Sequence, residues 1–124
     1  MSTQTNNLIK AFGYAIDGWK RGLKERNLKI HLTATVLVLL TSFLLKISTI
    51  EFIIILILIA LVISAELFNT AIEEICNTIT TALKLQYVDT TLPRDLAAGA
   101  VLVFASIAAI VGLFIFIPRL LTLF

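Results

Sequence analysis

The chain has 124 residues, of which 59% are hydrophobic and 15% are charged, and its mean hydropathy is +1.01. Soluble domains contain about 45–50% apolar and about 25% charged residues, so this composition indicates an integral membrane protein and argues against a soluble domain. The formal charge of +2 gives no indication of nucleic-acid binding, and the single cysteine excludes an intrachain disulfide and a cysteine-based metal cluster.

The first expected element is an amphipathic helix over residues 8–24. Apolar residues recur in this range at helical spacing, and basic residues lie between them. Tyr14 and Trp19 suit the level of the lipid headgroups, and the basic residues suit anionic lipid. We therefore expect this helix to lie on the membrane surface.

Three membrane-spanning helices are expected over residues 28–46, 50–79 and 95–118. Each contains an apolar run close to the length of about 20 residues that crosses the hydrocarbon core. The second helix is longer than a bilayer requires, so its last turns are expected to form a cytoplasmic extension. Residues 80–94 are expected to form the connecting loop, with Pro93 among its breakers, and Pro118 is expected to close the third helix.

The basic residues determine the expected orientation. Lys46 and Arg119 lie on one side of the expected spans, and the other basic residues lie on the opposite side. These are Lys10, Lys20, Arg21, Lys24, Arg26, Lys29, Lys84 and Arg94. The positive-inside rule places the N-terminus and the loop over residues 75–95 in the cytoplasm and the C-terminus outside. The predicted fold class is thus an all-α, multi-pass membrane protein with a surface helix and three transmembrane helices.

A polar stripe follows the apolar run over residues 52–63 in the second spanning helix. At about 100° per residue, Glu66, Asn69 and Glu73 fall on one face of this helix. Counted from Ile50 at the outer surface, Glu66 lies about 24 Å along the helix. That depth is just inside the inner boundary of a hydrocarbon core about 30 Å thick. Packing does not require a carboxylate at this depth, so Glu66 is a candidate functional residue.

The two carboxylates of the stripe are expected to have different roles. Glu73 lies about 10 Å beyond Glu66, in the headgroup zone, which is too far for both to hold one small ion. Glu66 can act as a general base on a lipid alcohol. Glu73 can hold Mg²⁺ with a second carboxylate, for which Glu25 at the start of the first spanning helix is the natural partner. Phosphates can be neutralised by Lys24, Arg26, Lys29 and Arg94.

Other readings of these residues remain open at this point. Asn69 can hydrogen-bond between helices, which is a common use of asparagine in membranes. His31 is expected to be an interfacial histidine rather than a metal ligand, since the chain has no second histidine. A glycine-rich phosphate loop is missing from the sequence, so a nucleotide site would need another construction. Spacing alone therefore indicates a membrane enzyme or carrier with an interfacial acidic site.

Three segments resemble the small bacterial diacylglycerol kinase and undecaprenol kinase family. They are ERNLKIH at residues 25–31, SAELFNTAIE at 64–73 and RDLAAGAV at 94–101, and the match is collinear over nearly the whole chain. The resemblance implies phosphoryl transfer from Mg-ATP to a membrane lipid alcohol in the bacterial inner (cytoplasmic) membrane. It also implies a surface helix, three membrane helices and a homotrimer whose active sites are shared between protomers.

The resemblance also assigns roles to individual residues. Glu66 would be the catalytic base and Asn69 would orient the reacting groups, while Glu25 and Glu73 would hold the metal ions. The residues expected to bind the nucleotide, directly or through the metal, are Tyr14, Glu25, Glu73, Arg94 and Asp95.

Three features depart from the family pattern. Asn77 stands where aspartate is common, Arg94 stands where lysine is common, and the loop over residues 78–93 is longer than usual. Arginine keeps the charge of lysine but changes its geometry. These departures leave the preferred nucleotide open.

The expected acceptor is undecaprenol, with diacylglycerol as the second choice, because the form Glu-Arg-Asn-x-x-Ile-His resembles the undecaprenol kinase branch. Two alternatives lie outside this class: a small oligomeric transporter in which Glu66 cycles protons, and a non-catalytic membrane subunit. Glu25 and Asp95 discriminate among them, since a proton carrier does not need these groups in the cytoplasm. Asn77 and the altered loop favour the subunit.

Overall fold

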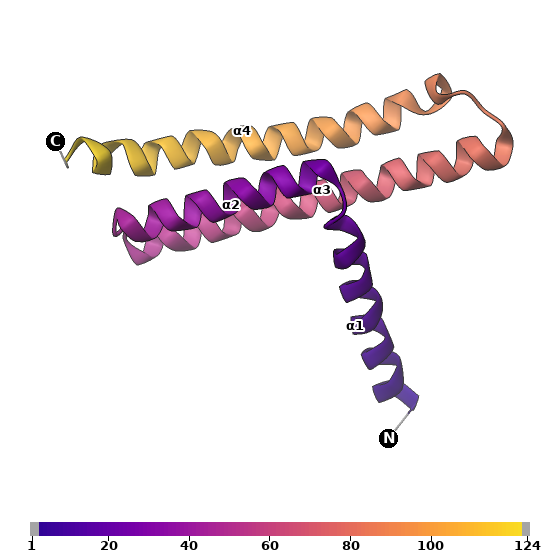
Figure 1. Cartoon of the computed structure of the whole chain (residues 1–124), viewed down its shortest axis with the longest axis horizontal. Coiled ribbons are helices and arrows are strands. Elements are labelled where there is room, and N and C mark those ends of the chain that lie inside the picture. Colours follow the sequence, from indigo (N-terminus) through magenta and orange to yellow (C-terminus); the bar gives the residue numbers. More distant parts are fainter. Residues whose placement is uncertain (1–2, 123–124) are drawn as a thin grey trace.

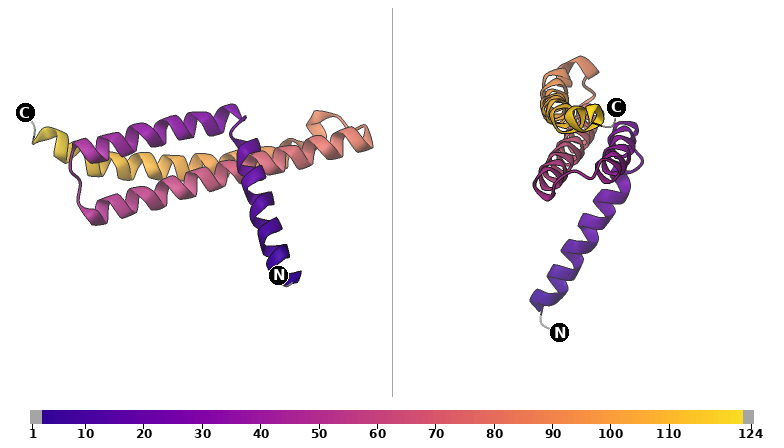
Figure 2. Two further views of the ribbon diagram at one scale, coloured as in Figure 1. Left: turned by 60° about the horizontal axis from the view of Figure 1, so that its bottom comes forward. Right: turned by 90° about the vertical axis from the view of Figure 1, so that its left-hand side faces the viewer.

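The structure is a computed structural model that describes residues 3–122, with side chains from residue 7 onward. It consists of α1 (Thr3–Gly22), α2 (Arg26–Leu44), α3 (Thr49–Leu83), the 3₁₀ helix η1 (Tyr87–Thr90) and α4 (Thr91–Leu121). The helices α2, α3 and α4 run side by side, whereas α1 leaves the bundle at a steep angle (Figure 1). Two further views show the same arrangement (Figure 2).

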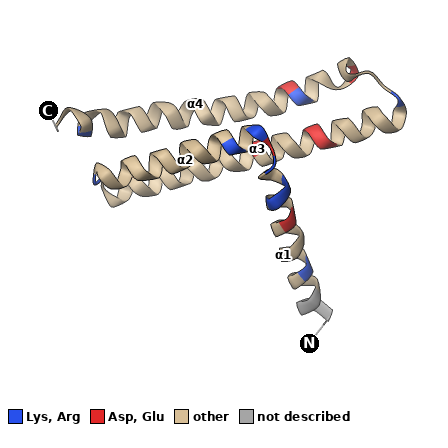
Figure 3. Ribbon diagram, viewed as in Figure 1, with Lys and Arg blue, Asp and Glu red and all other residues tan. Residues whose placement is uncertain are grey.

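Three of the helical segments are long and apolar enough to cross a membrane. They are Arg26–Leu44, Thr49–Leu83 and Tyr87–Leu121, the last of which includes η1. Lysine, arginine and acidic residues gather toward the end of the bundle that α1 joins, and most of the opposite half is free of charge (Figure 3). The expectation of an all-helical protein with three spanning helices is therefore confirmed.

The helix α1 begins at Thr3 and ends at Gly22, whereas the sequence predicted residues 8–24. It ends earlier because the following residues form a tight turn: Lys24 N–H donates to the carbonyl of Arg21 over 3.0 Å, and Glu25 N–H donates to that of Gly22 over 2.9 Å. This turn redirects the chain into α2. The position of α1 on a membrane surface stays a prediction.

The helices α2 and α3 form an antiparallel pair joined by a short loop. The loop ends in a capping box in which the Ser48 hydroxyl accepts from Glu51 N–H over 3.3 Å, and Ser48 N–H donates to Glu51 Oε2 over 2.6 Å. Arg119 of α4 donates to the same Glu51 oxygen over 2.6 Å and to the carbonyl of Lys46 over 3.0 Å. The far end of all three long helices is thus tied together.

The predicted loop over residues 80–94 is wrong in its extent. The helix α3 continues to Leu83, where Lys84 closes it in the left-handed conformation with φ 53°, and α4 already begins at Thr91. Pro93 is the third residue of α4, where a backbone N–H has no partner within the helix, so proline fits there and does not break the helix.

The predicted end of the third spanning helix at Pro118 is also too early, because α4 continues to Leu121. Proline removes only one hydrogen bond when it stands within the last turn of a helix. The side-chain bonds that Arg119 makes to Glu51 and Lys46 hold this last turn against the α2–α3 loop.

Leu28 is the best-buried apolar side chain, with 0% of its surface exposed, so its loss should destabilise the bundle. Leu28→Ala is expected to lower the free energy of unfolding by about 2–4 kcal/mol through the lost transfer free energy and the cavity left behind. Unfolding in mixed micelles of detergent and denaturing detergent would measure this. Leu37→Ala removes the same atoms from a position of α2 that is 60% exposed and serves as the control. Equal losses in the two variants would contradict the prediction.

Candidate active site

Two adjoining cavities lie where the start of α2 faces the middle of α3, and Asn27 and Glu66 line both. The inner pocket, about 140 Å³, is bordered in addition by Ile30, His31, Asn69, Ala98 and Val101. The acidic pocket, about 180 Å³, is bordered in addition by Glu25, Arg26, Thr70 and Glu73. Glu66 borders both the partly apolar inner pocket and the polar acidic pocket. The residue itself is only 3% exposed.

Helical spacing explains how the two walls of these pockets form. Asn27 and His31 are four residues apart and lie on one face of α2, and Glu66, Asn69 and Glu73 share one face of α3. The packing of α2 along α3 turns these two faces toward each other. The helix α4, which packs along the length of α3, supplies Ala98 and Val101 to the inner pocket.

Asn69 connects the two pockets. Its amide Nδ2 donates to Glu73 Oε1 over 3.1 Å, which holds the carboxylate of the acidic pocket in place. Its Oδ1 is buried and has no hydrogen-bond partner within residues 7–122. An unpaired buried acceptor costs about 1–3 kcal/mol, so a donor group in the inner pocket would be stabilised here.

The acidic pocket has oxygen donors that suit Mg²⁺. Glu25 and Glu73 both border it, and Asn27 and Thr70 add neutral oxygens. No cluster of three or more His, Cys, Asp or Glu that could hold a metal exists in the part of the chain that the structure describes. Mg²⁺ typically binds to one or two carboxylates together with waters and the oxygens of a phosphate, so this donor set fits it. Glu66 also borders this pocket, although its distance along the helix separates it from Glu73.

A second polar cluster surrounds Arg94 at the start of α4. The guanidinium of Arg94 donates from Nε to the Thr90 hydroxyl over 3.2 Å and from Nη2 to Asn77 Oδ1 over 3.0 Å. Its carbon Cζ lies 4.6 Å from the centre of the Tyr87 ring, which is cation–π geometry. The residues at positions 77 and 94, which the resemblance led us to expect as departures from the family pattern, therefore contact each other directly.

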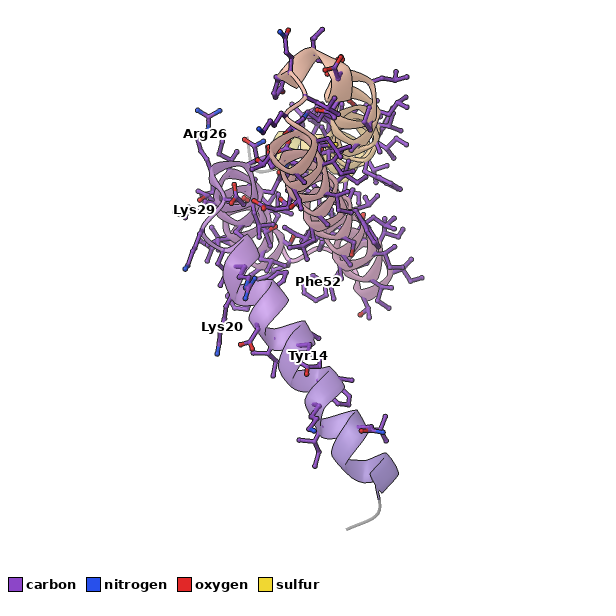
Figure 4. All side chains as sticks on the ribbon, turned by 90° about the vertical axis from the view of Figure 1, so that its right-hand side faces the viewer. Tyr14, Lys20, Arg26, Lys29 and Phe52 are labelled. Atoms are coloured by element: carbon purple, nitrogen blue, oxygen red, sulfur yellow. The ribbon has the colours of Figure 1, made fainter. Side chains whose placement is uncertain are left out.

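The structure brings together only some of the predicted site residues. Glu25, Glu66, Asn69 and Glu73 border the two pockets, as described above. The other three predicted nucleotide ligands border neither pocket; they are Tyr14, Arg94 and Asp95. Tyr14 is 74% exposed and lies on the part of α1 that extends away from the bundle (Figure 4).

Sequence analysis gave no role in the site to several of the residues that border the pockets. Asn27 lies in the quoted segment over residues 25–31 but was assigned no function, although its four-residue spacing from His31 signals a shared helix face. His31 was expected only as an interfacial residue, whereas it borders the same pocket as Glu66. Ala98 and Val101 gave no signal of their own, because small and apolar residues are common throughout α4.

The fold and the two pockets define a small all-helical membrane protein with an acidic site toward one end of its bundle. A family model described as prokaryotic diacylglycerol kinase matches residues 13–116. An undecaprenol kinase of Bacillus subtilis is 42% identical over 118 residues, which cover 94% of each chain. A diacylglycerol kinase of Synechocystis sp. is 34% identical over 118 residues, which cover 94% of this chain and 66% of that protein. No solved structure matches the chain significantly.

The chain belongs to the prokaryotic diacylglycerol kinase family, a family of lipid kinases. The resemblance that the three sequence segments indicated is thereby confirmed. Membership of a family of enzymes disfavours the two alternatives, the proton-cycling transporter and the non-catalytic subunit.

The contact between Asn77 and Arg94 leads to a prediction about stability. Asn77→Ala removes an acceptor from the guanidinium of Arg94, a residue that is only 7% exposed, so we expect a loss of about 1–3 kcal/mol in the free energy of unfolding. Asn77→Asp keeps the acceptor and adds a countercharge, so it should be at least as stable as the wild type. Thermal unfolding in detergent would compare the three proteins. The prediction fails if the two variants are destabilised alike.

Proposed function

We propose that this protein transfers the γ-phosphate of Mg-ATP to the hydroxyl group of a membrane lipid alcohol. Undecaprenol is the acceptor expected first, because the segment over residues 25–31 resembles the undecaprenol kinase branch and the undecaprenol kinase relative is 42% identical against 34% for the diacylglycerol kinase relative. Diacylglycerol, which the family description names, is the second choice. The observation that carries the proposal is the position of Glu66, whose carboxylate borders a polar outer cavity and a partly apolar inner one. Such a group can meet a water-soluble donor on one side and a lipid acceptor on the other.

The inner pocket is the proposed place of the acceptor hydroxyl. Ile30, Ala98 and Val101 offer an apolar wall to the carbon chain of the lipid, and its hydroxyl, which has a single proton, donates to Glu66. Glu66 takes the proton of this hydroxyl while the hydroxyl oxygen forms a bond to the γ-phosphorus. The bond between the γ-phosphorus and the bridging oxygen breaks in the same step, and ADP leaves with the electron pair.

The acidic pocket is the proposed place of the metal and the triphosphate. Glu25 and Glu73 would hold Mg²⁺ there, and the bound ion would supply neutralisation of the charge on the phosphates. Asn69 orients Glu73 through their 3.1 Å hydrogen bond. Both carboxylates border the same pocket as Glu66, the proposed base.

The proposed nucleotide ligands Tyr14, Arg94 and Asp95 fit a homotrimer with shared active sites. Within one chain they border neither pocket, and Tyr14 and Asp95 are exposed on α1 and α4. A neighbouring protomer can present such residues to the acidic pocket. An active site shared between protomers is therefore part of this proposal.

The proposed location is the bacterial inner membrane, with the N-terminus in the cytoplasm. Most basic residues lie toward the end of the bundle that α1 joins, and Lys46 and Arg119 lie at the other end (Figure 3). This orientation opens the acidic pocket toward the cytoplasm, where ATP is available. The surface position of α1 belongs to the same proposal, with apolar side chains such as Leu8 and Phe12 placed in the lipid.

The role of Glu66 as the base can be tested by transfer of labelled γ-phosphate in detergent, with undecaprenol and diacylglycerol compared as acceptors. Glu66→Gln keeps the shape of the side chain but cannot accept the proton, so the rate should fall by about 10²–10⁴-fold. Glu74→Gln makes the same change at an exposed position of α3 and should retain activity. Equal labelling of lipid by the wild type and Glu66→Gln would exclude this role, and no labelling by the wild type would exclude the proposed function.

The metal site can be tested by the Mg²⁺ dependence of the same reaction. Glu73→Gln and Glu25→Gln each remove one of the two proposed carboxylate ligands. We expect each to raise the Mg²⁺ concentration for half-maximal rate by about 10–100-fold, which is the usual size of effects on metal affinity near a site. Glu74→Gln is again the control. An unchanged Mg²⁺ titration in Glu73→Gln would contradict the assignment.

A further inference from the structure

Gly22, the last residue of α1, makes an unusually close approach to the other helices. A Cβ atom placed on Gly22 would lie 2.6 Å from Leu67 Cδ2 of α3 and 3.2 Å from Leu28 Cδ2 of α2. Carbon atoms in contact are normally separated by about 3.5–4.0 Å, so a side chain at this position would have to displace its neighbours. By contrast, a Cβ on Gly13 or Gly18 of the same helix would have no such neighbour within 4 Å.

The reason for glycine at position 22 is space and not backbone conformation. Glycine often ends a helix because it adopts the left-handed conformation without strain. None of the glycines that the structure describes has a positive φ, and Gly22 is among them. Because Gly22 has no side chain, the end of α1 can pack directly against Leu67.

This contact is connected to the acidic pocket by a short and rigid path. Leu67 is the neighbour of Glu66 in α3. On the other side, Glu25 N–H donates to the carbonyl of Gly22 over 2.9 Å, and Lys29 N–H of α2 donates to the carbonyl of Glu25 over 3.2 Å. Glu25 and Glu73 border the same pocket, so a change in how Gly22 packs on Leu67 would act on the position of Glu25 through these backbone bonds.

We propose that Gly22 is a positioning residue for the metal ligands of the active site. Because it has no side chain, the turn between α1 and α2 packs directly on Leu67, and this places Glu25 opposite Glu73. This inference rests on the proposed function, in which these two carboxylates hold the metal. A branched side chain at position 22 would lift the turn from α3 and move Glu25 outward. The inner pocket depends less on this turn, since four of its seven lining residues come from α3 and α4, and of the three from α2 only Asn27 lies in the first turn of that helix. The effect should therefore fall on metal binding more than on the lipid acceptor.

The test compares Gly22→Val with Gly18→Val and with the double variant Gly22→Val/Leu67→Ala. Both single substitutions raise helix propensity, so a difference between them reports the contact with Leu67. Binding of Mn²⁺, a probe for the Mg²⁺ site, is measured by electron paramagnetic resonance on the full-length protein in detergent without lipid. The Mg²⁺ concentration for half-maximal rate and the KM for undecaprenol are measured alongside.

Gly22→Val should weaken Mn²⁺ binding and raise the Mg²⁺ requirement by about tenfold, the lower end of effects from residues that support metal ligands. The KM of Gly22→Val for undecaprenol should stay within about twofold of the wild-type value. In Gly18→Val, both the Mn²⁺ affinity and the Mg²⁺ requirement should also stay within about twofold, as expected for a surface substitution. The double variant should recover most of the Mn²⁺ affinity, because Leu67→Ala removes the nearer of the two atoms that the new side chain meets. A purely structural role would not give this recovery or this separation between metal and acceptor.

Three outcomes would overturn the inference: wild-type Mn²⁺ affinity in Gly22→Val, no recovery in the double variant, or an equal loss in Gly18→Val. If Gly22→Val does not give a folded protein by gel filtration and circular dichroism, Gly22→Ala replaces it, with a smaller loss that Leu67→Ala must again reverse. The Mn²⁺ comparison does not depend on lipid phosphorylation. A wild type that binds Mn²⁺ but labels no lipid therefore contradicts the proposed function and still decides the role of Gly22.

Discussion

The structure depends on one constraint, which is that α3 must hold a carboxylate, that of Glu66, where its apolar run gives way to polar residues. Its 35 residues span about 52 Å, well beyond a hydrocarbon core of about 30 Å. Within the membrane, the backbone groups are satisfied inside the helix, so only side chains are free to bind or react. The sequence predicts that Glu66 lies where this helix leaves the core, and the carboxylate, which is only 3% exposed, requires partners there. The start of α2 and the packing of α4 supply them.

The arrangement around Glu66 separates two kinds of chemistry with a single side chain. The acidic pocket on one side is lined by Glu25, Thr70 and Glu73, which are suited to a metal and phosphates. The inner pocket on the other side adds the apolar surface of α4, which suits a lipid. Asn69 belongs to both sides, since its Nδ2 holds Glu73 and its Oδ1 is left for a donor. A kinase that joins a soluble donor to a membrane acceptor needs this kind of boundary.

The sequence predicted what lies along one helix better than what lies between helices. Hydropathy and helical spacing were sufficient for the three spans and for the stripe of Glu66, Asn69 and Glu73, because both follow from the geometry of a single helix. Pro93 and Pro118 misled the prediction of helix ends, since proline is compatible with a first turn and costs little in a last one. The close contact of Gly22 with Leu67 depends on the course of the turn after α1, which no residue pattern encodes.

The contact between Asn77 and Arg94 changes how these two residues are interpreted, which the resemblance led us to expect as departures from the family pattern. Taken singly, an asparagine in place of an expected aspartate and an arginine in place of an expected lysine suggest decay of a site. In the structure the two residues bind each other, and the forked guanidinium of Arg94 also reaches the hydroxyl of Thr90 and stacks on Tyr87. A lysine has no planar fork with which to make these contacts together. Because Asn77 is neutral, it does not compensate the charge of Arg94 at this contact. The cluster therefore keeps the hydrogen bonds and the ring contact of Arg94, and it also keeps a positive charge at the end of the bundle that carries the acidic pocket.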